Sequence, residues 1–309
     1  MTALRLRSSQ RPPQSVIQES RGDKIFSRLN YIFLSIILIL ILYPLVYTVS
    51  ASFSAPTAVM SGRVTLLPVD FTLIGYQKIF EYPTLVKGML NSVFYTVVGS
   101  AVSVVLTVMA AYPLTRKDLP GRRFLTVLFF FPMLFSGGLI PFYLVVRDMG
   151  LVNTRWALII PTALSVWNLI ITISFLRASI PDELYEAAQI DGCSDFGFLL
   201  KIVLPLAKAL IAVLFLVYAV AQWNQYFLSL VLQTNPDLAP LQIVLRNILI
   251  LNKIDLGMIA DVRSLAEQQA LQEQLKFSSI VVASVPVLLL YPFVQKYFVQ
   301  GLTIGAIKG

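Results

Sequence analysis

The chain alternates long apolar runs with shorter polar segments. Each run has more than 20 residues, and a helix of that length rises about 30 Å at 1.5 Å per residue, enough to cross the hydrocarbon core of a bilayer. The pattern therefore predicts an all-α membrane protein with six transmembrane helices. The predicted spans are residues 29–52, 89–111, 124–146, 156–176, 204–231 and 277–298.

Lysine and arginine are concentrated in the N-terminal segment 1–28 and in the short second loop, which carries Arg116, Lys117, Arg122 and Arg123. The longer first loop, 53–88, has only Arg63, Lys78 and Lys87. Cytoplasmic loops carry the excess of basic residues, so the N-terminus and the second loop are predicted to be cytoplasmic. Alternation then makes the loop 179–203 and the C-terminal tail 301–309 cytoplasmic, and the loop 233–276 external.

Composition supports this class and excludes several others. Hydrophobic residues make up 57% of the 309 residues, more than a soluble domain normally holds. The chain has one cysteine, Cys193, and no histidine, which argues against a disulfide framework, metal sites built on Cys or His, and His-activated nucleophiles. The net charge of +8 is spread between the apolar runs, so it indicates topology and not nucleic-acid binding. We predict no catalytic residue, no metal site and no cofactor bound by this chain.

The polar loop 179–203 is predicted to form two short helices joined at a glycine. Ser179 or Ile180 is a candidate N-cap, acidic residues follow in the first turn, and Gly192 is a natural stop. A second helix is expected from about Ser194 to Ile202. Leu184, Ala187 and Ala188 recur at helical spacing, and such a small-residue face suits docking into a groove of another protein.

This loop resembles the "EAA" loop of permease subunits of binding-protein-dependent ABC importers. In that family the loop is the coupling helix, which sits in a cleft of the cytoplasmic ATPase. This chain departs from the pattern at Ala209, where many members carry a proline. By resemblance, the residues that contact the ATPase or bear on that contact are Glu186, Ala187, Ala188, Asp191, Gly192, Leu204 and Pro205.

Further segments, among them 136–141, 150–154, 156–159 and 301–309, resemble the carbohydrate-uptake class of these permeases, the class of the smaller maltose permease subunit, and most closely its LplC/YtcP-like branch. The resemblance implies a type I importer fold in a bacterial cytoplasmic membrane. It implies a second homologous permease, a dimeric ATPase that holds ATP and Mg, an extracytoplasmic sugar-binding protein and an oligosaccharide cargo. It also implies that the loop 233–276 contacts the binding protein and that the tail contacts the ATPase through Gly301, Thr303, Gly305 and Lys308.

Neutral polar residues inside the apolar runs are candidates for a substrate pathway. The sequence Gln222-Trp223-Asn224-Gln225 interrupts the fifth run, and Asn168 lies near the middle of the fourth. These residues either line a sugar path or join helices by amide hydrogen bonds. Ser136-Gly137-Gly138, with Pro132 and Pro141, predicts a third span that is broken or closely packed. Its backbone either lines a cavity or, as we favour, packs tightly against another helix. Asn91 and Ser92, at the start of the second span, are predicted to cap its helix.

The apolar runs hold almost no ionisable side chain, and the chain lacks a G-x-x-x-x-G-K-[ST] phosphate loop. A transporter with neither feature is driven by a partner or is a passive pore. The alternatives are therefore an ABC importer for a non-sugar solute, and a channel or secondary carrier that works alone.

Overall fold

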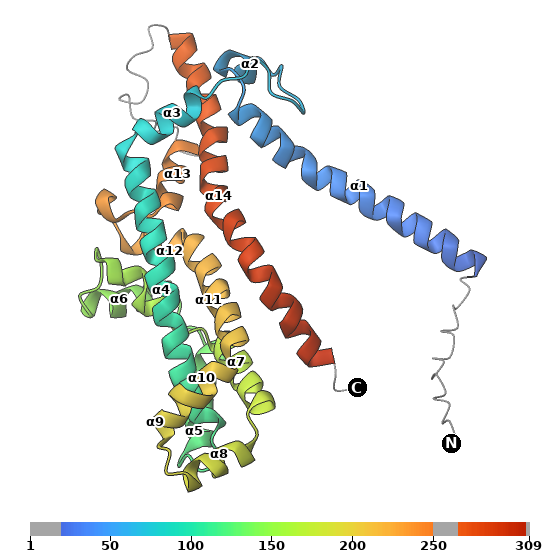
Figure 1. Ribbon diagram of the computed structural model, residues 1–309. Coiled ribbons are helices and arrows are strands. Elements are labelled where there is room, and N and C mark those ends of the chain that lie inside the picture. Colours follow the sequence, from blue (N-terminus) through green and yellow to red (C-terminus); the bar gives the residue numbers. More distant parts are fainter. Residues whose placement is uncertain (1–19, 250–264, 307–309) are drawn as a thin grey trace, which may run out of the picture. The chain divides into compact units, whose positions relative to one another are not determined.

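The computed structural model describes residues 20–249 and 265–306, and all regular structure in these ranges is helical. The chain divides between Tyr47 and Thr48, inside a continuous helix, into two parts that are described separately. Most of the first helix thus forms a part of its own, and the rest of the expected transmembrane domain is the part that begins at Thr48 (Figure 1).

The first helix, α1 (Arg21–Ser52), begins eight residues before the span predicted from hydropathy. A reciprocal capping arrangement explains this start. The Ser20 hydroxyl accepts from the Asp23 amide, and the Asp23 carboxylate accepts from the Ser20 amide, both at 3.1 Å. Such pairs satisfy amides that a helix N-terminus leaves without partners. The polar segment 1–28 is therefore helical from Arg21 onward.

Two helices, α4 (Pro83–Thr115) and α11 (Lys208–Trp223), pack along each other at the centre of the second part. Small side chains on α4 permit the close approach, because a Cβ added at Gly99 would lie 2.9 Å from the side chain of Gln222. Ser100 and Ser103 are buried on the same helix. Small residues are the usual means by which membrane helices approach closely.

The third apolar run forms two helices, α5 (Arg122–Leu134) and α6 (Leu139–Asp148). The break falls at residues 135–138, where Gly138 adopts a positive φ of 83°. Ser136, Gly137 and Gly138 are exposed, and a Cβ at Gly138 would meet nothing within 4 Å. The predicted break is confirmed, but the favoured alternative, tight packing, is wrong within this chain.

The fourth and fifth runs are bent. In the fourth, the 3₁₀ turns η1 (Arg155–Leu158) and η2 (Ile160–Thr162) meet α7 (Val166–Ser179) at 49°. In the fifth, residues 195–206, which end in α10 (Leu204–Leu206), meet α11 at 81° although Ala209 is not a proline. The predicted interruption near Gln222 is confirmed, because α11 ends at Trp223 and α12 (Phe227–Leu232) follows.

One end of the second part is built by α2 (Pro56–Met60), α3 (Ile74–Glu81), η4 (Pro236–Leu238), α13 (Leu241–Leu249) and the start of α14 (Leu265–Ala306). The predicted sixth span lies inside α14, which continues without a break through the expected end of the external loop at 276. Gly301, Thr303 and Gly305 belong to the last turns of this helix, and Lys308 lies outside the described residues.

Asn91 and Ser92 do not cap their own helix, because α4 begins at Pro83. They hold the last loop instead. The Asn91 amide donates to the carbonyls of Asp237 at 2.8 Å and Ala239 at 3.1 Å, and the Ser92 hydroxyl accepts from the first amide of α13, Leu241, at 2.8 Å. The assignment to the N-terminus of α4 is therefore wrong.

Loops that alternate along the sequence meet at opposite ends of α4 (Figure 1). At one end, the first loop and the last loop are joined by the Gln274 amide, which donates to the Ser54 carbonyl at 2.7 Å, and by the Lys87–Asp237 ion pair. At the other end, the second loop contacts α8 (Asp182–Ile190), as shown by the Lys117–Asp182 ion pair. In the described residues, α1 and α4 are each long and apolar enough to cross a membrane, as are the two bent pairs if each is one span.

A glycine substitution tests the contact between α4 and α13. A Cβ added at Gly88 would lie 2.8 Å from Val244, whereas one added at Gly22 of α1 would meet only Ser20, at an ordinary 3.6 Å. Both glycines are helical, Gly22 in the first turn of α1 and Gly88 in the interior of α4, so alanine gains at least as much helix propensity at Gly88 as at Gly22. We expect Gly88→Ala to be less stable than Gly22→Ala by about 1 to 3 kcal/mol, measured as thermal unfolding in detergent. Equal stability of the two variants would contradict this packing.

Candidate functional site

The predicted coupling loop forms two short helices, α8 and α9 (Asp195–Phe198). Pro181 is the N-cap of α8, which corrects the expected cap at Ser179 or Ile180, and Asp182 and Glu183 occupy its first turn as predicted. Gly192 ends the helix with a φ of 76°, a left-handed conformation that suits glycine. The Ser194 hydroxyl then accepts from the Gly197 amide at 3.2 Å and starts α9.

One face of α8 belongs to the core of the protein. Tyr185 and Ala188 are 6% and 7% exposed and pack with Tyr112 of α4 and Phe198 of α9. The rings of Tyr185 and Phe198 meet edge to face, with centroids 5.2 Å apart. Ala188 is thus a core residue, so the expected docking face of Leu184, Ala187 and Ala188 is wrong in its composition.

The opposite face of α8 is open. Glu186, Ala187, Asp191 and Gly192 are exposed. Beside them Ile190 is 87% exposed, more than any other large apolar side chain in the part of the chain that the structure describes. A strongly exposed isoleucine next to a small alanine and two acids is a surface that a partner protein could cover. We call these five residues the docking face.

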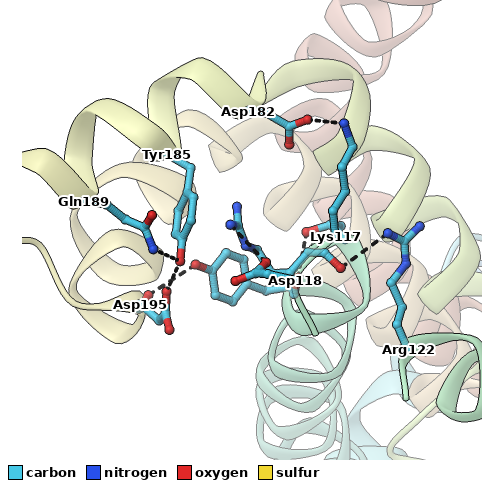
Figure 2. A network of polar contacts seen from close by, with 10 residues as sticks. Lys117, Asp118, Arg122, Asp182, Tyr185, Gln189 and Asp195 are labelled. Atoms are coloured by element: carbon cyan, nitrogen blue, oxygen red, sulfur yellow. Dashed lines mark hydrogen bonds and ion pairs between the residues drawn. The ribbon is translucent and has the colours of Figure 1, made fainter. Parts of the chain in front are cut away.

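One hydrogen bond joins α8 to α9, and a second, within α8, orients the same hydroxyl. The Tyr185 hydroxyl donates to the Asp195 carboxylate at 2.5 Å and accepts from the Gln189 amide at 2.6 Å (Figure 2). The bond to Asp195, and secondly burial, raise the pKa of the Tyr185 hydroxyl above its ordinary value. The phenol therefore keeps its proton and remains a donor at neutral pH.

The second loop holds α8 from the other side. Lys117 forms an ion pair with Asp182 at 2.5 Å (Figure 2). The guanidinium of Arg116 lies over the Tyr185 ring, 3.1 Å from its centroid. Arg116 also pairs with Asp118 at 3.1 Å. We call the contacts of Arg116, Lys117, Asp182, Tyr185 and Asp195 the brace.

The Lys117–Asp182 ion pair of the brace keeps both of its charges over a wide pH range. The hydrogen bond from Lys117 lowers the pKa of Asp182 below 3.8, and the bond to Asp182 raises the pKa of Lys117 above 10.5. The pair is therefore lost only when acid protonates Asp182 below its usual pKa, or when base deprotonates Lys117 above its usual pKa. Both side chains are therefore charged at physiological pH.

Leu204 and Pro205 do not lie on the docking face. Both belong to α10, where Leu204 packs against the same core as Tyr185 and Pro205 is exposed. They precede the 81° bend into α11. Leu204 and Pro205 thus lie in the segment that connects α8 and α9 to the central helix α11.

Three of the pathway candidates come together in a cleft of about 360 Å³ between α7 and α11. Asn168, Gln222 and Gln225 line it. Trp223 is buried instead against Leu241 and other residues of a separate core cluster, and the Asn224 amide donates back to the Val220 carbonyl at 2.8 Å. Ser136, Gly137 and Gly138 lie at the break between α5 and α6, and they are not part of the cleft lining.

The structure adds residues to the brace around α8 and to the cleft between α7 and α11 that the sequence did not single out. Tyr185 and Lys117 belong to the brace, and Trp167 and Tyr218 line the cleft. The basic residues of the second loop are evident in the sequence, but their pattern indicates topology and not a contact with α8. A tyrosine on the buried side of a short helix has no distinctive pattern, since aromatic residues at such positions are ordinary core residues.

A family model described as "Binding-protein-dependent transport system inner membrane component" matches residues 103–304. The chain is 42% identical over 288 residues to the polygalacturonan/rhamnogalacturonan transport system permease protein YtcP of Bacillus subtilis (strain 168), covering 93% of this chain and 99% of that protein. It is 38% identical to the protein LplC of the same organism, covering 95% and 98%.

A solved structure has the same fold. It is the crystal structure of a bacterial ABC transporter involved in the import of the acidic polysaccharide alginate, and one of its chains is 34% identical to this one with a TM-score of 0.84, covering 91% of this chain and 99% of that chain. The fold is thus that of an ABC importer permease, and the helices are those of a membrane subunit. The chain belongs to the family of binding-protein-dependent transport system inner membrane components.

Proposed function

We propose that the chain is one of two permease subunits of an ATP-driven oligosaccharide importer, and that it receives force from a cytoplasmic ATPase through the docking face of α8. The proposal rests on the difference between the two faces of α8. The brace fixes its inner face, whereas Ile190 and Ala187 on its outer face are exposed. The chain itself binds neither ATP nor Mg in this scheme. Its ATPase partner holds both.

Six spans with both ends in the cytoplasm agree with the contacts between loops. The Lys117–Asp182 pair joins the second and fourth loops, which are expected to be cytoplasmic. The first and last loops, expected to be external, are joined by Lys87 and Asp237, and the third loop joins them where the Thr234 amide donates to Asn153 at 2.7 Å. The first, third and last loops thus contact one another, and the second and fourth loops contact each other. Two loops on the same side of a membrane are separated by an even number of spans, and this holds for every one of these pairs.

We expect force to reach the membrane helices through the connections of α8 to the two central helices, α4 and α11. ATP binding would close the ATPase dimer and move α8 of each permease. Because the brace ties α8 to the end of α4, and α10 leads through its bend into α11, a displaced α8 carries both central helices with it. Tilting of α11 against α7 would open the cleft, and ATP hydrolysis would reset it. The docked residues Glu186, Ala187, Asp191 and Gly192 act by fit and charge, not by catalysis.

An oligosaccharide is the cargo that the relatives favour. The permease protein AraQ of Halalkalibacterium halodurans, which is 30% identical to this chain over 299 residues, is named for arabinooligosaccharides, and the names of YtcP and of the alginate transporter also refer to polymers of sugars. We propose that a second permease completes the pathway and that an extracytoplasmic sugar-binding protein delivers the cargo to the loop 233–276. The tail at Gly301, Thr303, Gly305 and Lys308 is proposed to contact the ATPase.

The docking face is tested at Ala187, which is exposed and has no role in the core. We expect Ala187→Arg to lower sugar uptake and transport-coupled ATPase activity at least about tenfold, because a long cation prevents close approach of the partner. Ala187→Ser is the matched control and should retain both activities. Ala188→Arg is less informative, since Ala188 is buried and its replacement disturbs the fold. Normal uptake by Ala187→Arg would refute docking at this face.

The brace is tested by removing a single hydroxyl. Tyr185→Phe keeps the ring contacts but loses the bonds to Asp195 and Gln189, and we expect a local loss of about 1 to 3 kcal/mol. Hydrogen exchange of the α8 amides should become correspondingly faster. Tyr143→Phe is the control, because that hydroxyl bonds to none of the described residues. Unchanged exchange in α8 would mean that the brace does not hold it.

Orientation is tested with the natural cysteine. Cys193 lies beside Gly192 and is partly exposed, and it is the single cysteine of the chain. A membrane-impermeant maleimide should label it only after the membrane is opened. In a Cys193→Ser background, Met60→Cys in the first loop should be labelled in intact cells, since Met60 is 52% exposed. Labelling of Cys193 from outside would reverse the proposed topology.

A further inference from the structure

A second cavity, of about 320 Å³, lies where the second loop meets α8. Its lining includes Thr115, the last residue of α4, Arg122, the first residue of α5, and Arg177 in the last turn of α7. We call it the basic cavity. Membrane helices end where the hydrocarbon core gives way to the polar headgroups, so the ends of three helices place the basic cavity at the depth of the headgroups.

Two of the cations that line the basic cavity have no acidic partner. Arg116 pairs with Asp118 and Lys117 pairs with Asp182, but Arg122 and Arg177 form no ion pair with any acid of the described residues. Glu183 also lines the cavity, and it is exposed and pairs with neither of these arginines. Positive charge is therefore left uncompensated at Arg122 and Arg177.

The same two arginines have hydrogen-bond donors to spare. Arg122 Nη1 donates to the Arg116 carbonyl at 3.3 Å, and Arg177 Nη2 donates to the Leu114 carbonyl at 3.0 Å. These carbonyls lie at the C-terminal end of α4, where a helix leaves acceptors unpaired, so capping explains one N–H of each arginine. A guanidinium has five N–H donors, and the described residues accept no other from either side chain.

The position of the two arginines is unfavourable without an anion. They come from different helices, α5 and α7, and their charges repel each other. The lining also contains the buried side chains of Tyr112, Leu176 and Phe198, which lower the local dielectric constant and strengthen the attraction of an arginine for an anion. An anion between Arg122 and Arg177 would remove the repulsion and accept the spare N–H groups.

The positive-inside rule explains basic residues here only in part. Arg123 satisfies that rule as an exposed residue outside the cavity lining. The rule requires a local excess of positive charge, but it does not require arginines of two helices to line the same cavity. That convergence is what indicates a ligand.

We propose that the basic cavity binds the phosphate of an anionic phospholipid, which Arg122 and Arg177 hold together by charge-assisted hydrogen bonds. A guanidinium matches the geometry of phosphate, and basic pockets between membrane helices on the cytoplasmic side bind anionic headgroups. The proposed topology places this end of α4 on that side. The site goes beyond the proposed function, because it depends neither on the sugar nor on docking of α8.

A lipid in the basic cavity also acts on the brace. Arg116, Lys117, Asp182 and Tyr185 belong to the brace and line the cavity as well. A bound phosphate cancels the repulsion between Arg122 and Arg177, and so it stabilises the junction of the second loop with α8. Hydrogen exchange of the α8 amides is therefore slower when the anionic lipid is present.

Cysteine protection in the assembled transporter tests the site. The chain carries Cys193→Ser, the other subunits lack cysteine, and the nanodiscs contain phosphatidylcholine alone or an equal mixture with phosphatidylglycerol. Ile180→Cys places a thiol in the cavity lining, and Ala178→Cys, exposed and outside the lining, is its control on the same segment. We expect phosphatidylglycerol to slow maleimide labelling of Ile180→Cys at least about fivefold and to leave Ala178→Cys unchanged.

Substitutions of the arginines identify the residues that bind the phosphate. Arg122→Gln and Arg177→Gln should each reduce the protection of Ile180→Cys to less than about twofold, because a charged hydrogen bond is lost. Arg177→Lys keeps the charge and should restore part of it. Arg123→Gln removes a charge of the same loop outside the lining and should retain full protection. Labelling in pure phosphatidylcholine should be equal in all these variants, which shows that the cavity keeps its shape.

The other outcomes contradict the site. If glycerol 3-phosphate in solution protects Ile180→Cys equally well in pure phosphatidylcholine, the ligand is a soluble phosphate and the lipid is wrong. If Arg123→Gln weakens protection as much as Arg122→Gln, the lipid is attracted only by the general charge of the loop. If Ile180→Cys is unreactive in both lipids but reacts when the ATPase is removed, a segment of that partner covers the cavity. Unchanged exchange in α8 together with unchanged labelling would refute the site while leaving the importer intact.

Discussion

The contact between Tyr185 and its neighbours determines how the membrane part of this protein can be moved. Tyr185 is enclosed by Phe198 and the Asp195 carboxylate, both of α9, and by the guanidinium of Arg116 in the second loop, so a helix of nine residues is held by two separate elements. A helix this short is not stable alone in water. This packing keeps the helix folded, and it also lets the helix move as a rigid unit with the elements that hold it.

Whereas α8 is held rigidly, the helices α7 and α11 are irregular. The path of α11 bends at Ala207 and stops at Trp223, and α7 is preceded by 3₁₀ turns. Breaks at membrane depth leave backbone groups without helical partners, and they are tolerated where the backbone is buried in protein or lines a cavity. Here the Gln225 amide reaches back to the Leu158 carbonyl, which joins the two irregular segments. The cleft lies where they meet, and both Thr162 of η2 and Gln225 line it.

The sequence predicted the class of fold well, because hydrophobic runs and basic loops report directly on the solvent around them. It also located the two short helices and the interruption after Gln222. It could not predict which face of α8 is inside. Ala187 and Ala188 are identical as residues, and only the packing of α8 on the core cluster that contains Tyr112 and Phe198 decides that Ala188 is buried while Ala187 is open. The same holds for Asn91 and Ser92, whose partners are almost 150 residues away and cannot be seen in local sequence.

The central claim is that α8, α9 and the end of α4 move as one body when the ATPase closes. The direct measurement is a distance between spin labels in the assembled transporter, with and without a non-hydrolysable ATP analogue. Labels at Phe196→Cys in α9 and Val105→Cys in α4, both exposed and placed in a Cys193→Ser background, report on the brace. The account predicts that this distance stays the same while the distance between the Phe196 position and its counterpart in the second permease shortens. A change of several ångströms between Phe196 and Val105 on nucleotide binding would contradict it.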